Sequence, residues 1–137
     1  MIRALILVVS LALGWAAPAG AQGRSAATEV DVQIVLAVDI SYSMDPEEQR
    51  LQREGYIKAI TSQEVIDAIR KGLIGKIAVS YLEWAGHHDR QVLIDWRVID
   101  GPESARAFAA ELESKPYRRA FRTSISGAIQ ASVDLLE

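Results

Sequence analysis

An uninterrupted apolar run, residues 34–38 (IVLAV), constrains the fold more than any other part of this 137-residue sequence. A strand that exposes one face to water alternates apolar and polar residues, whereas a strand covered on both faces is apolar throughout. We therefore expect residues 30–38 to form a central strand that is buried on both faces, in a sheet with helices on each side.

The remaining hydrophobic pattern predicts the other elements of this sheet. Helical periodicity follows a capping box at Asp45 and Glu48 and returns after residues 100 and 124. Two further strands are expected at residues 76–84 and 91–99, and the short turn between them predicts an antiparallel hairpin. This order of elements is typical of an α/β domain with an open, mostly parallel sheet, an antiparallel edge hairpin and helices on both faces.

The N-terminal residues have the pattern of a secretory signal peptide. Arg3 gives a positive start, residues 4–13 are almost wholly apolar, and residues 19–21 (AGA) match a small-x-small cleavage site. The apolar run is shorter than the ~20 residues that a membrane-spanning helix needs. We expect residues 1–21 to be a signal peptide cleaved after Ala21, followed by a tail at residues 22–29. The mature protein would be periplasmic or secreted, without a stable membrane span.

Charge and cysteine content exclude some classes of protein. The chain has 15 basic and 18 acidic residues, and removal of Arg3 with the signal peptide leaves 14 against 18, a formal net charge of −4. This acidic balance argues against a nucleic-acid-binding protein. The chain has no cysteine, so an exported form would be held by its core or by a ligand rather than by disulfides.

Oxygen-bearing side chains follow the first predicted strand at alternating positions: Asp39, Ser41 and Ser43. The carboxyl end of a strand, where it meets a helix, is the place where open α/β sheets bind ligands. Three oxygen ligands on one turn suit a hard divalent cation such as Mg²⁺, which would keep water or an open position for an anion. The alternative is that both serines are ordinary turn and helix-cap residues.

The Asp-x-Ser-x-Ser motif after an apolar strand resembles the metal-ion-dependent adhesion site (MIDAS) of von Willebrand factor A (vWA) domains. Residues 123–129 (TSISGAI) are similar to a second motif of that family, in which a threonine that opens a helix adds a ligand. The resemblance covers residues 30–137. More narrowly, residues 32–44 (VQIVLAVDISYSM) are similar to a bacterial vWA-like family with signal peptides and no assigned biochemical function.

The resemblance implies a Rossmann-like vWA sheet and a site that binds rather than catalyses. Ser41, Ser43 and Thr123 would supply hydroxyl oxygens to the metal, and Asp39 would ligate it directly or through water. The metal would be Mg²⁺, or Mn²⁺ or Ca²⁺. An acidic side chain of a partner protein would fill its open position, so the implied function is that of a non-enzymatic, exported protein-binding module.

Two features depart from the family pattern. The family's remaining ligand is an aspartate after a fourth strand, which would follow Glu137. We therefore expect residues 30–137 to be a partial domain, from a C-terminally truncated chain or a fragment. In addition, residues 118–122 (RRAFR) stand where the family often has glycines. Three arginines near the site would repel a cation and attract an anionic partner.

Two alternative functions stay open. One is a phosphatase-like or hydrolase-like enzyme that uses Asp39 or Ser41. A phosphatase of this kind would need a second aspartate at the position of Ser41, and a serine hydrolase needs a base near its nucleophile. The two histidines, His87 and His88, are expected in the hairpin turn at the far side of a sheet edge. The other alternative is a vWA-shaped scaffold that no longer binds metal.

Overall fold

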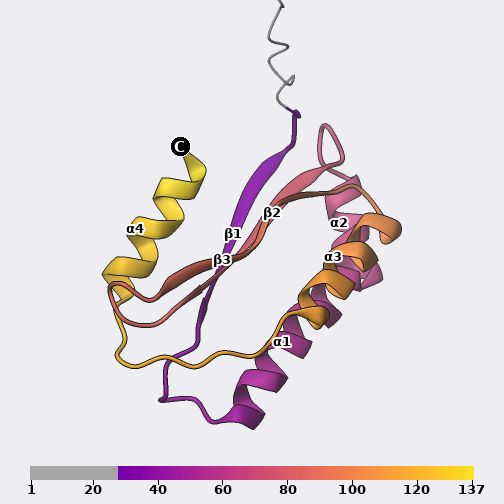
Figure 1. Cartoon of the computed structure of the whole chain (residues 1–137). Coiled ribbons are helices and arrows are strands. Elements are labelled where there is room, and N and C mark those ends of the chain that lie inside the picture. Colours follow the sequence, from indigo (N-terminus) through magenta and orange to yellow (C-terminus); the bar gives the residue numbers. More distant parts are fainter. Residues whose placement is uncertain (1–27) are drawn as a thin grey trace, which may run out of the picture.

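The computed structural model describes residues 28–137, so the signal-peptide prediction and its cleavage after Ala21 lie outside the described residues. The elements in chain order are β1 (Val32–Asp39), α1 (Pro46–Thr61), α2 (Gln63–Arg70), β2 (Ile77–Trp84), β3 (Arg90–Ile99), α3 (Pro102–Ser114) and α4 (Ile125–Leu136). Helices α1, α2 and α3 cover one face of the sheet and α4 lies over the other (Figure 1). This layered arrangement confirms the predicted α/β class.

The three strands form an open mixed sheet in the order β1-β2-β3. β1 and β2 are parallel, with Val32 opposite Ile77 and Asp39 opposite Trp84. β2 and β3 are antiparallel and are joined by a short turn, which confirms the predicted hairpin. The arrangement is consistent with part of a Rossmann-like fold, and the parallel pair places the carboxyl ends of β1 and β2 at the same edge.

The prediction that the first strand is the central one and is buried on both faces is wrong. Val38 is 2% exposed, but Ala37 is exposed and residues 34–36 are only half-buried. Among the described residues β1 has a strand neighbour on one side only. An apolar groove of about 300 Å³ also separates its outer face from α4. The fully buried strand is β2, because β1 and β3 flank it and helices lie over both of its faces.

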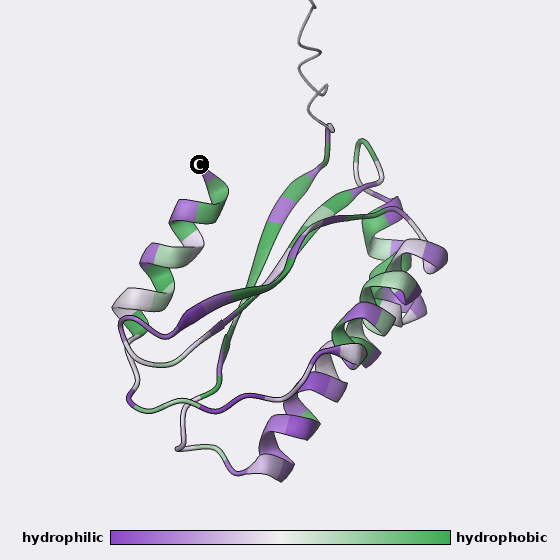
Figure 2. Ribbon diagram, in the orientation of Figure 1, coloured by the Kyte–Doolittle hydropathy of each residue, from purple (hydrophilic) through white to green (hydrophobic). Residues whose placement is uncertain are grey.

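The main core lies between the sheet and the layer formed by α1, α2 and α3. Phe108 and Leu112 of α3 are 2% and 0% exposed and pack with Ile99 and Tyr81 of the sheet. Burying a large apolar side chain stabilises a fold by about 1.5–3 kcal/mol. Hydrophobic residues follow β1 and β2 through the middle of the molecule, whereas the first turns of α1 are hydrophilic (Figure 2).

The start of α1 is fixed by the predicted capping box. Asp45 Oδ1 accepts a hydrogen bond from the Glu48 backbone N–H at 2.9 Å, and Glu48 Oε2 accepts one from the Asp45 N–H at 2.8 Å. Pro46 occupies the first helical turn, where the absence of an N–H costs no hydrogen bond. The turn after β1 therefore runs directly into a well-defined helix. None of the helices in residues 28–137 combines the length and hydropathy needed to cross a bilayer.

Asp31 ties the amino end of β1 to the loop before β2. Its carboxylate accepts hydrogen bonds from the backbone N–H groups of Ile74, Gly75 and Lys76 at 2.8, 2.7 and 3.1 Å. A Cβ at Gly72 would lie 2.3 Å from Asp31 Oδ2, so the loop approaches the carboxylate closely at a glycine. The hydrogen bonds, that from Ile74 above all, lower the pKa of Asp31 below its ordinary value of 3.8.

This pKa predicts a specific pH dependence for Asp31→Asn. Because the folded-state pKa lies below the unfolded-state value, the ionised carboxylate stabilises the fold above about pH 4. That contribution is lost as the pH falls through the folded-state pKa. In urea denaturation, we expect the variant to have a lower free energy of unfolding than the unmodified protein at pH 7. This difference in stability should narrow toward pH 3. Glu113→Gln, an exposed replacement on α3, should have the same stability as the unmodified protein. A stability difference for Asp31→Asn that stays constant with pH would show that the ionised carboxylate is not its cause.

Candidate metal-binding site

The turn after β1 brings Asp39, Ser41 and Ser43 side by side. Asp39 Oδ1 accepts a hydrogen bond from the Ser41 backbone N–H at 2.7 Å, and the hydroxyl oxygens of Ser41 and Ser43 lie 2.6 Å apart. Ser41 is 2% exposed, Asp39 is half-buried and Ser43 is exposed. One carboxylate and two hydroxyls thus form a compact group of oxygens that runs from the interior to the surface.

The segment that carries Thr123 is paired with this turn. The Tyr42 N–H donates to the Ala120 carbonyl at 3.1 Å, and the Ala120 N–H donates to the Ile40 carbonyl at 3.0 Å. These bonds make a parallel bridge between Ser41 and Ala120. Thr123 is exposed and follows this bridge by three residues, directly before the N-terminal cap of α4. The fourth predicted ligand therefore lies on the chain segment that packs against the other three.

Two of the arginines in residues 118–122 hydrogen-bond to other parts of the chain. The Arg119 guanidinium donates to the carbonyl oxygens of Tyr42 and Met44 and lies 4.4 Å from the Tyr42 ring centroid. Arg118 donates to the side chain of Gln91. Arg119 therefore holds the turn that carries the two serines, which a glycine in its place would not do.

Arg122 and two aromatic rings face solvent beside the turn. Arg122 is exposed and has a φ of 69°, a left-handed conformation that is uncommon for a residue with a side chain. Tyr42 and Phe121 stack with ring centroids 4.4 Å apart, yet they remain 49% and 72% exposed. Exposed aromatic and arginine side chains are enriched where proteins bind one another.

His87 and His88 lie at the same end of the sheet as Asp39, so their expected position at the far side was wrong. β1 and β2 run parallel, and the turn that leaves β2 therefore begins next to the end of β1. The Ser124 N–H donates to the Ala85 carbonyl at 2.7 Å, which joins this turn to the start of α4. The two imidazole rings contact each other edge to face, with centroids 4.9 Å apart.

Within residues 28–137, no group of three or more histidine, cysteine, aspartate or glutamate side chains is placed to hold a metal ion. The candidate site is of a different kind, since three of its four side chains are hydroxyls. Hydroxyl and carboxylate oxygens are hard ligands, which suit Mg²⁺, Mn²⁺ or Ca²⁺ better than a softer metal.

Three buried polar residues behind the turn were missed by the sequence analysis. Gln49 and Arg53 of α1 are 5% and 3% exposed, and Glu83 of β2 is 2% exposed. The sequence does contain a signal for Glu83, because it is the one charged residue in the β2 sequence IAVSYLEW. Nothing in the periodicity of α1 indicates that Gln49 and Arg53 face inward.

Fold and site together define an open-sheet α/β domain with clustered oxygen side chains at the end of a parallel strand. Residues 29–137 match the model of a family described as "Protein of unknown function (DUF1194)". The chain belongs to this family. Comparisons with curated proteins and with solved structures gave no match.

Proposed function

We propose that residues 29–137 form a vWA-like module that binds a partner protein through a divalent metal ion. The observation that carries this proposal is the turn in which Asp39, Ser41 and Ser43 place three side-chain oxygens together at the carboxyl end of β1. Thr123, on the segment paired with that turn, supplies the fourth ligand. The metal is Mg²⁺, with Mn²⁺ or Ca²⁺ as substitutes.

The chemistry of these ligands favours binding over catalysis. A single carboxylate and three neutral hydroxyls leave one of the two positive charges of a divalent cation uncompensated. The ion therefore keeps water molecules that an external anion can displace. A carboxylate on a partner protein is such an anion, and Arg122 beside the site adds attraction for it. The exposed Tyr42 and Phe121 rings provide apolar contact around that carboxylate.

The hydrolase alternative gains no support from the histidines. Among the described residues, neither His87 nor His88 makes a side-chain hydrogen bond to Ser41 or Ser43, whose hydroxyls bond to each other. We also propose, on the N-terminal pattern alone, that the protein is exported to the periplasm or secreted after cleavage behind Ala21.

Water-proton relaxation with Mn²⁺ as the probe tests the proposed function. Bound Mn²⁺ that keeps exchangeable water should enhance relaxation, and a chelator should abolish the enhancement. A short peptide with one glutamate should lower the enhancement by displacing water, whereas the matched glutamine peptide should have no effect. No enhancement with the protein, or an equal response to both peptides, would contradict the proposal.

A further inference from the structure

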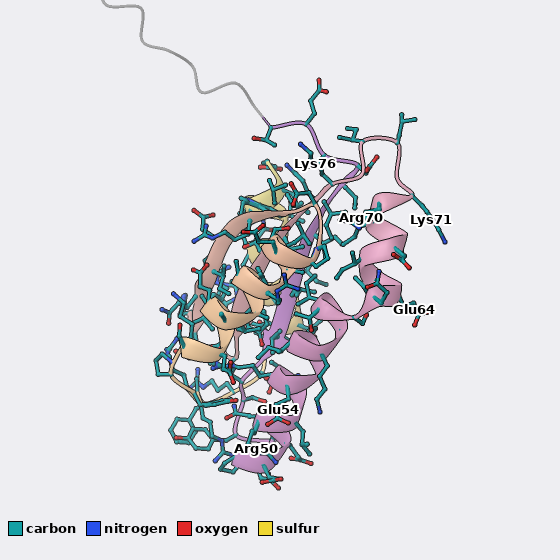
Figure 3. All side chains as sticks on the ribbon, turned by 90° about the vertical axis from the view of Figure 1, so that its right-hand side faces the viewer. Arg50, Glu54, Glu64, Arg70, Lys71 and Lys76 are labelled. Atoms are coloured by element: carbon teal, nitrogen blue, oxygen red, sulfur yellow. The ribbon has the colours of Figure 1, made fainter. Side chains whose placement is uncertain are left out.

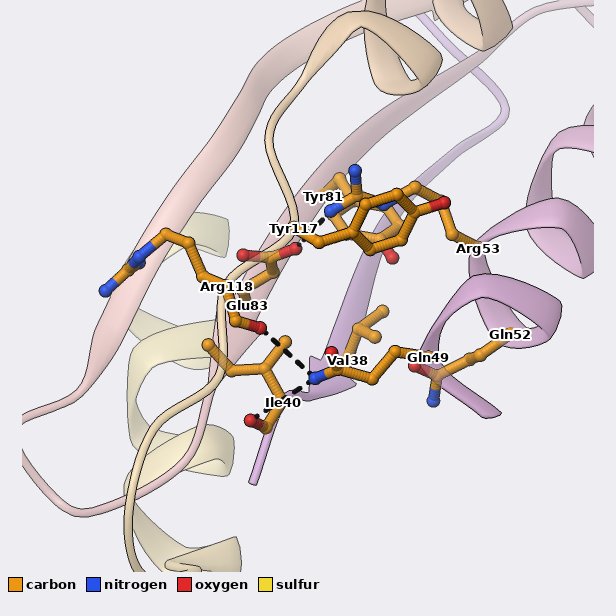
Figure 4. Close-up of a pocket in the computed structure, with 9 residues that line it drawn as sticks. All are labelled: Val38, Ile40, Gln49, Gln52, Arg53, Tyr81, Glu83, Tyr117 and Arg118. Carbon is orange, nitrogen blue, oxygen red and sulfur yellow. Dashed lines mark hydrogen bonds and ion pairs between the residues drawn. The ribbon is translucent and has the colours of Figure 1, made fainter. Parts of the chain in front are cut away.

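Two buried polar side chains on the inner face of α1 hold backbone carbonyls near the candidate site. Gln49 and Arg53 are four residues apart and therefore lie on one face of the helix. Gln49 Nε2 donates to the Arg118 carbonyl at 3.1 Å and, more weakly, to the Ile40 carbonyl at 3.5 Å. Figure 4 shows this side chain between the end of β1 and the segment that leads to Thr123.

Arg53 holds the start of the same segment. Its guanidinium donates to the Lys115 carbonyl at 2.6 Å and to the Pro116 carbonyl at 3.4 Å, and it lies 4.0 Å from the Tyr117 ring centroid. Residues 115–124 contain neither a helix nor a paired strand apart from the bridge at Ala120. A helix or a paired strand is held by its own backbone hydrogen bonds. Residues 115–124 have few of these, so their position depends more strongly on the hydrogen bonds from Gln49 and Arg53.

Glu83 fixes the Arg53 side chain from the sheet. The ion pair measures 2.8 Å and its side chains are 4% and 2% exposed. Glu83 lies opposite Val38, one residue before Asp39. A buried ion pair is costly to desolvate and often stabilises a fold no better than apolar residues would. Its presence here is better explained by the geometry that it imposes on Arg53 than by its contribution to stability.

The space around these residues is too small for a ligand. The cavity that Gln49, Arg53 and Glu83 line has a volume of about 10 Å³, which leaves room for one water molecule at most. The cluster is therefore a joint between α1, the sheet and residues 115–118 rather than a second binding pocket.

We propose that Gln49 and Arg53 are positioning residues that hold the Thr123 segment against the Asp39–Ser43 turn. This inference rests on the proposed function: the affinity of the site for metal depends on two side chains that do not contact the metal. Loss of the hydrogen bonds from Gln49 or Arg53 lets residues 115–124 move away from the Asp39–Ser43 turn. Thr123 then no longer completes the set of metal ligands.

Gln49→Leu in the full chain tests the inference, because it removes the hydrogen-bond donor at similar side-chain size. Two quantities are measured: the dissociation constant for Mn²⁺, and hydrogen exchange of the Tyr42 and Ala120 amides in metal-free protein. We expect metal affinity to fall about tenfold, the lower end of the roughly 10–100-fold loss found when a residue that orients metal ligands is replaced. Both amides should exchange faster, whereas the exchange rates of amides that pair β2 with β3 should not change. Arg53→Lys keeps a positive charge next to Glu83 but loses the planar guanidinium with its several N–H donors. It should show the same two effects, weaker Mn²⁺ binding and faster exchange of the two amides.

Replacements on exposed faces provide matched controls. Arg50 and Glu54 lie on the exposed face of α1 (Figure 3), where Arg50 pairs with Glu47 and Glu54. Arg50→Lys and Gln63→Leu, an exposed replacement on α2, should change neither quantity. Unchanged exchange of the Tyr42 and Ala120 amides in Gln49→Leu would overturn the inference, as would faster exchange with unchanged Mn²⁺ affinity. Absence of Mn²⁺ binding by the unmodified protein would instead overturn the proposed function, and amide exchange would still decide whether the joint holds the segment.

Discussion

Arg53→Met should lower the free energy of unfolding by about 3–5 kcal/mol at pH 7, the cost typical of breaking a buried ion pair by removal of one partner. The replacement has a similar length but leaves the Glu83 carboxylate 2% exposed and without its cation. Urea denaturation followed by circular dichroism measures the loss. Arg50→Met, on the exposed face of the same helix, should change stability by no more than about 0.5 kcal/mol.

The stability lost in Arg53→Met should shrink as the pH falls, because the cause of the loss is the ionised form of Glu83. Burial raises the pKa of Glu83 above its ordinary value of 4.5, although Arg53 opposes the rise. A raised folded-state pKa means that the ionised carboxyl costs stability above that pKa, and that this cost disappears as the pH falls below about 4.5. Without Arg53 the ionised Glu83 carboxyl costs more stability. The difference in free energy of unfolding between Arg53→Met and the unmodified protein should therefore narrow from pH 7 to pH 4.5.

A double variant separates the lost ion pair from lost packing. Arg53→Met combined with Glu83→Leu removes both charges and should recover much of the stability lost in the single variant. A double variant as unstable as Arg53→Met, or a loss that is equal at pH 7 and pH 4.5, would show that the buried carboxylate is not the cause.

Asp39→Ala should weaken Mn²⁺ binding by about 100-fold or more, because it removes the sole carboxylate of the four proposed ligands. Its effect on folding should be modest. Among residues 28–137 the Asp39 carboxylate accepts a single hydrogen bond, from the Ser41 N–H, and such a bond contributes about 0.5–1.5 kcal/mol. Calorimetric titration with Mn²⁺ measures the affinity, and thermal unfolding of the metal-free protein measures the stability.

Asp45→Ala is the matched control for Asp39→Ala. It removes a carboxylate six residues along the same stretch, and it should cost about 0.5–2 kcal/mol of stability because Asp45 caps α1. Its effect on Mn²⁺ affinity should be small. An unchanged affinity in Asp39→Ala, or an equal loss in both variants, would show that Asp39 is not a ligand.

Local sequence signals were enough to predict most of the elements. The capping box at Asp45 and Glu48 is a pattern within four residues, and the hairpin between β2 and β3 follows from two strands separated by a short turn. The alternating spacing of Asp39, Ser41 and Ser43 also predicted a shared turn. Each of these features depends on neighbours along the chain, which a sequence pattern records directly.

Features that depend on contacts across the fold could not be predicted in the same way. The apolar run of β1 suggested burial on both faces, but burial depends on which strands and helices lie beside it, and β2 takes the central position. His87 was misplaced because its position beside the end of β1 depends on the pairing of β1 with β2, which is a contact across the fold. Arg53 and Glu83 are 30 residues apart in sequence, so neither one alone indicates the pair.

Anomalous diffraction from crystals of the protein grown with Mn²⁺ tests the existence of the metal site most directly. We predict one peak at the carboxyl end of β1, about 2.0–2.2 Å from the hydroxyl oxygens of Ser41, Ser43 and Thr123. Asp39 should bind the ion directly or through water. A well-ordered turn without a peak, or a peak at His87 and His88 alone, would contradict the account.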